Sequence, residues 1–195
     1  MQLGFAYVES GFCRAKNAVN LMMKNLMDFV MGSLAFWAIG YALMTGKDSP
    51  GLFGTTGWFL HGNAYDVHTY LIWMFEVVFA ATAATIVSGG VAERIKFSVY
   101  LFYSIIVSAI IYPIYGHWVW GGGWLSKLPY GIGAVDFAGS GVVHTIGGTI
   151  TLVGAMMLGP RIGRYDKGKT KTNPWTQHPN GSTWCFYSLV WLVWI

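Results

Sequence analysis

Residues 69–92, TYLIWMFEVVFAATAATIVSGGVA, form a continuous apolar run in which Glu76 is the only charged residue. A helix needs about 20 mostly apolar residues to cross the hydrocarbon core of a bilayer. Three further runs have this character: 25–45, 98–125 and 137–160. Asp28, in the first of them, is their only charged residue. The sequence therefore predicts an all-α membrane protein with four complete spanning helices.

The composition supports this fold class. Hydrophobic residues make up 54% of the chain and charged residues 10%, against about 25% charged in soluble domains. The net charge of +4 comes from basic residues scattered between apolar runs, which does not favour a nucleic-acid partner. The sequence has no nucleophile paired with a base and no phosphate-binding loop, and Cys13 and Cys185 have no metal-ligand spacing. We therefore expect no enzyme activity, metal or cofactor.

The opening residues 1–13 are largely apolar but too few to span, and they lack the basic start and cleavage site of a signal peptide. They predict the second half of a helix.

Lys47 and Lys127 are the only basic residues in the second and fourth connections. Since positive loops stay in the cytoplasm, we expect the N-terminus outside. The other ten basic residues lie in the odd-numbered connections: Arg14, Lys16, Lys24, Arg94, Lys96, Arg161, Arg164, Lys167, Lys169 and Lys171.

Five ionisable residues fall within or against the apolar runs: Glu9, Asp28, Glu76, Asp136 and His144. Such residues are functional-site hypotheses, because each needs a partner or a water-filled path. Glu9 and Asp28 lie near predicted helix ends, where a structural role is favoured. Glu76 lies about two turns from the outer end of its helix and fits either role. His144 follows Asp136 by about 12 Å on one predicted helix, and a role in plain packing stays open for it.

Aromatic residues gather toward the predicted outer side. Phe75 and Phe79 are four residues apart and share a helix face. Tyr112, Trp118 and Trp120 lie toward the outer end of the run at 98–125. Tyrosine and tryptophan at this depth are typical of an interfacial belt. The alternative is an inward-facing cup that holds a cation by its attraction to the rings, worth about 2 kcal/mol when desolvated.

Four stretches together resemble the ammonium transporter (Amt/Mep/Rh) family, in its Amt branch: ESGFCRAKNAVNLMMKNLMDF (9–29), ATAATIVSGGVAERIKFS (81–98), YPIYGHWVWGGG (112–123) and VDFAGSGVVHTIGGT (135–149). The resemblance covers residues 1–172. It implies an inverted-repeat fold of about eleven helices. This chain would supply the N-terminal part: half of the first helix, the next four helices, and an aberrant segment in place of the sixth.

The resemblance also implies roles for individual residues. Trp120 and Phe75 match an outer cup that recruits ammonium. Phe79 matches the outer of two stacked phenylalanines that close the pore, and His144 matches the first of two histidines on the conduction path.

Three more positions complete the implied site. Asp136 matches a structurally indispensable aspartate near the recruitment cup, and Tyr112 an aromatic residue of the pore wall. Glu76 stands where the family usually has glutamine, so it adds a negative charge to the outer vestibule. The resemblance places the second pore phenylalanine, the recruitment serine and the second histidine beyond residue 195.

The implied function is transport of ammonium and methylammonium across the plasma membrane by a homotrimer with one pore per subunit. After recruitment at the cup, ammonium would lose its proton, and ammonia and the proton would pass by separate routes or by a coupled equivalent, because a bare cation pays a large desolvation cost in an apolar pore and ammonia does not. Imidazoles can pass the proton along. An ammonium-sensing module and an inert fragment are the alternatives. The basic loop 160–172 either binds a PII-type regulator or fixes topology, and topology is favoured.

The tail, 173–195, reads NPWTQHPNGSTWCFYSLVWLVWI and does not match the family pattern. Tryptophan has the single codon TGG, so a shift of one base turns each tryptophan into a codon that begins GG, which encodes glycine. The four tryptophans are spaced by nine, seven and three residues, as are glycines of the family pattern. We therefore interpret 1–172 as a partial transporter domain and 173–195 as an out-of-frame tail. A divergent tryptophan-rich helix is the alternative.

Overall fold

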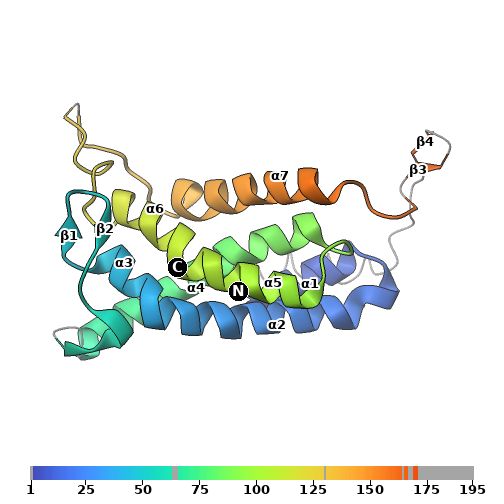
Figure 1. The fold of residues 1–195 in the computed structure, drawn as a ribbon, viewed down its shortest axis with the longest axis horizontal. Coiled ribbons are helices and arrows are strands. Elements are labelled where there is room, and N and C mark those ends of the chain that lie inside the picture. The colour runs from blue at the N-terminus through green and yellow to red at the C-terminus, as the bar shows by residue number, and fades with distance from the viewer. Residues whose placement is uncertain (1, 63–65, 130, 164, 167–168, 171–195) are drawn as a thin grey trace.

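The computed structural model describes residues 2–62, 66–129, 131–163, 165–166 and 169–170. It is a bundle of membrane-length helices with two short hairpins at its ends (Figure 1). The predicted tail at 173–195 lies outside the described residues. The α-helices are α1 (Gln2–Gly11), α2 (Ala18–Ala35), α3 (Tyr41–Thr45), α4 (Val67–Val91), α5 (Phe97–Ile106), α6 (Tyr112–Val119) and α7 (Ile146–Leu158).

Short π-helical and 3₁₀ turns join several of these helices. The π-turn η2 (Phe36–Gly40) joins α2 to α3, and η5 (Val107–Ile111) joins α5 to α6. A third π-turn, η6 (Ser140–Thr145), opens α7. The 3₁₀ turns are η1 (Ala15–Asn17) and η3 (Trp58–Leu60), and the hairpins pair β1 (Asp48–Ser49) with β2 (Phe53–Gly54) and β3 (Tyr165–Asp166) with β4 (Lys169–Thr170).

Four continuous helices are long and apolar enough to cross a membrane, which confirms the four predicted spans. They are Ala15–Thr45, Val67–Val91, Phe97–Val119 and Ser140–Leu158. The chain is therefore a multi-pass membrane protein. The first span begins ten residues before the predicted start, and two polar side chains of this added stretch, Asn17 and Lys24, bond Glu93 and Glu9.

Small residues set the packing of the bundle. Helices α2 and α7 lie on opposite sides, with α4 and α5 between them (Figure 1). A methyl group placed on Gly147 of α7 would lie 2.8 Å from Cβ of Ile86 on α4, so Gly147 permits this close approach, as small residues do between membrane helices. Gly148 faces open space. Of these two neighbouring glycines, Gly147 therefore permits the close approach of α7 to α4, and Gly148 does not take part in it.

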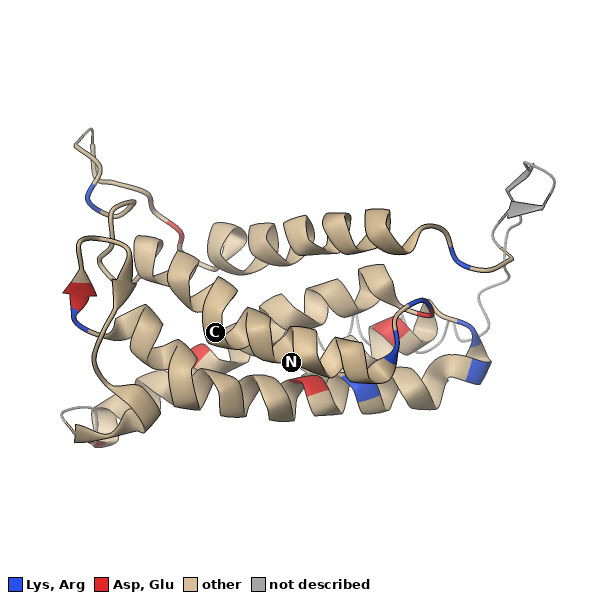
Figure 2. Cartoon of the chain, viewed as in Figure 1, with Lys and Arg blue, Asp and Glu red and all other residues tan. Residues whose placement is uncertain are grey.

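The basic residues lie mainly at the two ends of the bundle, and one basic segment lies within α2 (Figure 2). That segment contains Lys24, which was predicted to belong to the first connection. Lys24 is instead buried inside α2. The prediction failed because a lysine near a helix end is assumed to reach water, whereas here a carboxylate on α1 accepts its hydrogen bond.

Candidate functional site

Helix α4 and the end of α6 bring three predicted site residues together in one aromatic row. The ring centroids of Phe75 and Phe79 are 5.1 Å apart, and those of Phe79 and Trp120 are 6.2 Å apart. Both pairs meet edge to face, at interplanar angles of 62° and 71°. Such geometry places the positive edge of one ring on the negative face of the next. Phe75 is 57% exposed, so the outer end of the row is open.

Asp136 fixes the start of the last helix. Its carboxylate accepts backbone N–H bonds from Gly139 and Val142, both at 2.8 Å. It also bonds the backbones of Ser140 and Gly141, at 2.9 Å each. These four N–H groups are those that a helix N-terminus leaves without partners. Burial alone would raise the pKa of Asp136, but the backbone bonds from Val142, Gly141 and Gly139 lower it overall.

The position of Asp136 differs from the prediction. Asp136 and His144 were expected on one helix, but η6 begins only at Ser140, after Gly139 in the left-handed conformation at φ 84°. Asp136 therefore caps the helix from the preceding loop. The reason is local: a carboxylate that bonds four successive N–H groups has to lie ahead of them, and Gly139 supplies the turn that glycine adopts at little cost.

Trp120 is tied to the same loop. Its indole Nε1–H donates to the backbone carbonyl oxygen of Asp136 at 2.6 Å. The aromatic row and the capped start of η6 are thus held together by one short hydrogen bond.

His144 lies in η6, and its side chain is exposed on the face of the bundle. Its backbone N–H donates to the carbonyl oxygen of Gly139 at 2.9 Å. Within the described residues, the imidazole of His144 has no hydrogen bond and no ring contact with the aromatic row. The structure therefore does not bring His144 against Phe79 or Trp120.

Glu76 and Tyr112 form a polar contact beside the aromatic row. The Tyr112 hydroxyl donates to Oε2 of Glu76 at 3.4 Å. Tyr112 is fully buried and packs edge to face on Phe36, with ring centroids 6.0 Å apart. Glu76 follows Phe75 in α4, but consecutive residues of a helix do not share a face, so its carboxyl group contacts Tyr112 beside the row.

Sequence reasoning missed a polar contact at the end of the bundle that holds β1 and β2. His117 of α6 is fully buried; its Nδ1 lies 2.8 Å from the Met44 carbonyl oxygen and its Nε2 lies 3.0 Å from Oδ1 of Asp48. Lys127 bonds the other Asp48 oxygen at 3.0 Å. The hydrogen bond with His117, and then that with Lys127, lower the pKa of Asp48 to about 2. No sequence spacing links these residues, so no pattern could have found them.

A second missed feature lies at the opposite end of the bundle, which the orientation predicted from the basic residues makes the inner end. Glu93, which follows α4, accepts hydrogen bonds from the backbone N–H and Nε of Arg14, both at 3.1 Å, and from Asn17 at 2.6 Å. Burial alone would raise the pKa of Glu93, but the bonds from Arg14 and Asn17 lower it overall. Arg161 lies 3.4 Å from the second Glu93 oxygen. We refer to Arg14, Asn17, Glu93 and Arg161 as the inner clamp.

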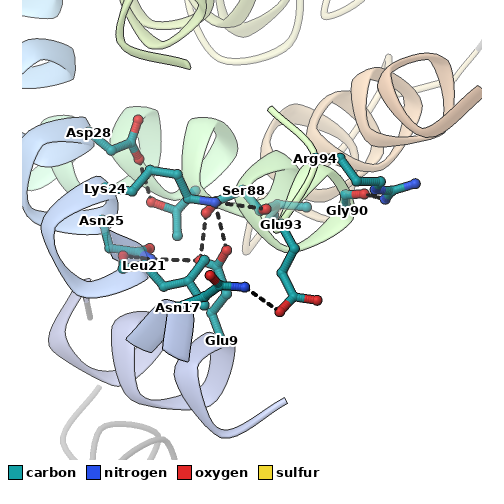
Figure 3. A network of polar contacts seen from close by, with 12 residues as sticks. Glu9, Asn17, Leu21, Lys24, Asn25, Asp28, Ser88, Gly90, Glu93 and Arg94 are labelled. Atoms are coloured by element: carbon teal, nitrogen blue, oxygen red, sulfur yellow. Dashed lines mark hydrogen bonds and ion pairs between the residues drawn. The ribbon is translucent and has the colours of Figure 1, made fainter. Parts of the chain in front are cut away.

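The two carboxylates that were expected near helix ends are both buried. Glu9 of α1 pairs with Lys24 at 2.9 Å, and Asp28 is fully buried within α2 and caps no helix (Figure 3). Glu9 lies in the last turn of α1, as expected, whereas Asp28 lies within α2, because α2 starts earlier than expected. Packing of α1 against α2 removes both groups from the interface. In the part of the chain that the structure describes, no three His, Cys, Asp or Glu side chains gather as a metal site.

The Ammonium Transporter Family model matches residues 1–195. The ammonium transporter Amt2 of Archaeoglobus fulgidus is 67% identical over 172 residues, which cover 85% of this chain and 37% of that protein. A putative ammonium transporter of Synechocystis is 42% identical over 200 residues, covering all of this chain and 44% of its own length. The chain thus spans about two fifths of these relatives.

Solved structures agree with the sequence relatives. A structure titled Sensor Amt Protein superposes with a TM-score of 0.85 at 39% identity, covering 95% of this chain and 47% of that one. Candida albicans Mep2 superposes with a TM-score of 0.76 at 26% identity, covering 95% and 42%. The match confirms the predicted fold, an N-terminal part of the all-α transporter architecture. The chain belongs to the ammonium transporter family.

Proposed function

We propose that this chain forms the outer recruitment site and the first half of a path that carries ammonium and methylammonium across a membrane. The observation that carries the proposal is the row of Phe75, Phe79 and Trp120, tied through Trp120 to the loop of Asp136. Family membership supports ammonium as the substrate, and the relatives' names state that activity for them.

The aromatic row suits a weakly hydrated cation. The face of each ring is negative, so a cation that has shed part of its water is held by the rings. Glu76 adds a negative group one residue from Phe75, where it can favour the cation over neutral ammonia. Asp136 acts as a positioning residue, because it holds the helix start to which Trp120 is bonded.

We assign the later steps of the path to Phe79 and His144. Phe79 would act as a gate below the recruitment cup, since it lies one helical turn further along α4 than Phe75 and its ring contacts both Phe75 and Trp120. Loss of the proton before the apolar segment removes the desolvation cost of a bare cation. His144 would then accept or pass that proton, because its exposed imidazole lies on the face of the bundle that this chain leaves uncovered.

The experiment measures methylammonium uptake in a host whose own ammonium transporters are deleted. One arm expresses this 195-residue chain. A second arm expresses the Archaeoglobus fulgidus relative with its matching N-terminal segment replaced by residues 1–172. We expect Trp120→Leu in the second arm to reduce uptake at least about tenfold, or about 1.4 kcal/mol. The matched control is Trp124→Leu, outside the row; equal losses in both variants would overturn the assigned site.

Ammonium sensing is the second candidate function. It is favoured by the structural neighbour titled Sensor Amt Protein, which superposes with the TM-score of 0.85. A sensing role needs binding at the same aromatic row but no flux. Binding of methylammonium to the replaced protein without uptake would support the sensor and exclude transport. If the protein with the replaced segment takes up methylammonium and the 195-residue chain does not, the 195-residue chain is an inert fragment of a transporter.

We also propose the orientation and assembly that the family resemblance implies. The N-terminus would lie outside in the plasma membrane, since the odd-numbered connections hold most of the basic residues. We propose a homotrimer as the assembly. Helix α7 exposes five apolar side chains that suit a protein partner or lipid: Leu152, Val153, Met156, Met157 and Leu158. The basic loop 160–172 would fix topology rather than bind a PII-type regulator.

A further inference from the structure

The inner half of the bundle holds a cluster of ionisable side chains that the proposed path does not use. Glu9 comes from α1, and Lys24 and Asp28 come from α2 (Figure 3). Their exposed fractions are 6%, 2% and 0%. We refer to these three residues as the inner cluster. Charges at this depth are costly unless each is compensated.

Glu9 is fully compensated as a carboxylate. Oε1 accepts a hydrogen bond from Lys24 Nζ at 2.9 Å, and Oε2 accepts bonds from Asn25 at 2.6 Å and from the Ser88 hydroxyl at 2.5 Å. Lys24 also donates to the Ser88 carbonyl oxygen at 3.3 Å. A buried ion pair with its remaining acceptors filled meets the geometric condition for retaining both charges.

Asp28 lacks such compensation. Its Oδ2 accepts a hydrogen bond from the Thr85 hydroxyl at 2.6 Å, and its Oδ1 accepts one from the Ser104 hydroxyl. Both partners are neutral, and among the described residues no cationic group bonds this carboxyl. Lys24 lies one turn away on the same helix face, but its ammonium is directed to Glu9. An unpaired carboxylate in a low-dielectric interior is strongly disfavoured.

The other helices around Asp28 supply no positive charge. Helix α4 contributes the neutral Thr85 and Ser88, and α5 contributes Tyr100 and Tyr103. The Tyr103 hydroxyl donates to the Ala84 carbonyl oxygen at 2.9 Å. With Glu9, Lys24 and Asp28 all ionised, the cluster carries two negative charges and one positive charge. The surroundings therefore favour uptake of one further positive charge.

Tyr100 gives an independent sign that a site is present. Its side chain is fully buried, and its ring centroid lies 4.9 Å from the ammonium of Lys24. The Tyr100 hydroxyl lies close enough to Asp28 and Ser88 to interact with both, but within the described part of the chain it makes no hydrogen bond of good geometry. Buried hydroxyls without partners are rare, and each such group needs an explanation. A bound water molecule beside Asp28 would satisfy it.

A pocket of about 360 Å³ lies between α1 and α4, beside the cluster. Glu9 and Thr85 both line it, together with Phe5, Val8, Ile86 and Arg161. Because Thr85 lines the pocket and bonds Asp28 directly, one hydroxyl group lies between the pocket and the Asp28 carboxyl, and a water molecule that entered the pocket could exchange a proton there. Asp28 lies ten residues into α2, or about 15 Å from its first residue, which is near the middle of a bilayer.

We propose that the inner cluster is a proton-binding site in which Asp28 holds one exchangeable proton while Lys24 remains paired with Glu9. Uptake transfers a proton from water in the pocket and forms one O–H bond on an Asp28 oxygen. The net charge of the cluster changes from −1 to 0, and no other bond is made or broken. Two hydroxyl oxygens are too few to complete the six-to-eight-oxygen shell typical of a cation such as Ca²⁺. The proposal does not require ammonium transport.

The test is infrared difference spectroscopy of the full chain in lipid vesicles, recorded between acid and alkaline pH. We expect a carbonyl band of a protonated carboxyl that disappears at alkaline pH and is missing from Asp28→Asn. Asp66→Asn is the matched control, since Asp66 is an exposed carboxyl at the outer start of α4, and this variant should keep the band. Persistence of the band in Asp28→Asn would overturn the proposal.

A second variant keeps the test decisive if Asp28→Asn fails to assemble. Glu9→Gln removes the partner of Lys24, so that Lys24 can turn to Asp28 one helical turn away. We expect Asp28 to bind its proton at least about tenfold more weakly, a shift of about one pH unit. An unchanged midpoint would contradict the proposal. A pH-independent carboxylate band that responds to sodium but not choline would also overturn it, in favour of a metal-cation site.

Discussion

The indole N–H of Trp120 donates a 2.6 Å hydrogen bond to the backbone carbonyl oxygen of Asp136, the residue whose carboxylate bonds four N–H groups at the start of η6. The candidate recruitment tryptophan and the capping aspartate are therefore one structural unit. A change at Asp136 should reach the aromatic row through this bond, although the Asp136 side chain does not touch the row's rings.

Asp136→Ala should destabilise the chain by about 2 kcal/mol, because it leaves four backbone N–H groups without their acceptor. Asp136→Asn keeps one carbonyl oxygen and should cost less. Thermal unfolding in detergent, followed by tryptophan fluorescence, measures both. Asp66→Ala is the control, since Asp66 caps α4 through one backbone N–H bond from Thr69. If Asp136→Ala costs no more than Asp66→Ala, the cap is not the main role of Asp136.

The outer hairpin should resist acid until Asp48 is protonated. The pKa of Asp48 in the folded chain is about 2, lowered chiefly by the hydrogen bond with His117. A lowered folded pKa contributes stability that is present above the ordinary value, near 3.9, and is lost as the pH falls toward 2. Hydrogen exchange of the hairpin amides should therefore rise between about pH 4 and pH 2. Asp48→Asn should remove this dependence, and an unaltered profile in that variant would refute it.

Lys127→Met is the matched comparison for the hairpin. Lys127 bonds the same carboxylate, but its side chain is 61% exposed, and exposed ion pairs contribute little to stability. We expect Lys127→Met to leave most of the acid protection in place. A loss as large as that of Asp48→Asn would show that the lysine, rather than the buried histidine, holds the hairpin.

Glu76→Gln should weaken the attraction of the outer site for methylammonium, because it removes a negative charge next to Phe75. In the protein with the replaced N-terminal segment, we expect the apparent KM to rise about fivefold, or about 1 kcal/mol. Tyr112→Phe removes only the 3.4 Å bond to Glu76 and should have a smaller effect. A lower KM in Glu76→Gln would mean that the carboxylate traps the cation instead of recruiting it.

The side chain of Glu93 bonds Arg14 and Asn17, and its backbone is in a strained conformation. Two variants separate the effect of losing the bonds from the effect of relieving the strain. Its φ is 64°, in the left-handed region, which costs a residue with a side chain about 1 kcal/mol or more relative to glycine. Glu93→Ala and Glu93→Gly lose the same bonds to Arg14 and Asn17. We therefore expect the glycine variant to melt at the higher temperature. Equal melting temperatures would show that the inner clamp does not impose strain on this residue.

The tail prediction is tested at the level of the gene. Resequencing across the codon of Asn173 should reveal a one-base insertion or deletion, and the restored frame should encode glycine at the positions of Trp175, Trp184, Trp191 and Trp194. The matched control is the codon for Trp124, which should stay in frame. A confirmed reading frame through residue 195 would instead establish a genuine tryptophan-rich segment.

The sequence by itself determined the class of the fold. Runs of about 20 apolar residues cross membranes because lipid cannot satisfy backbone polar groups, so span positions follow from local composition. The Phe75–Phe79 pair also followed from local geometry, since residues four apart share a helix face. The four predicted spans were confirmed on this basis, and the family resemblance drew on motifs within single helices or short loops.

Only the tertiary structure decided how the polar residues are paired. Lys24 with Glu9, Asp28 with Thr85, and Glu93 with Arg14 join residues that lie 15, 57 and 79 positions apart. Sequence reasoning expected Glu9 and Asp28 to reach the interface or cap a helix because it could not know which neighbour each would meet. Whether a charge in a membrane is tolerated depends on a partner delivered by another helix, and that partner is fixed by packing across the whole bundle.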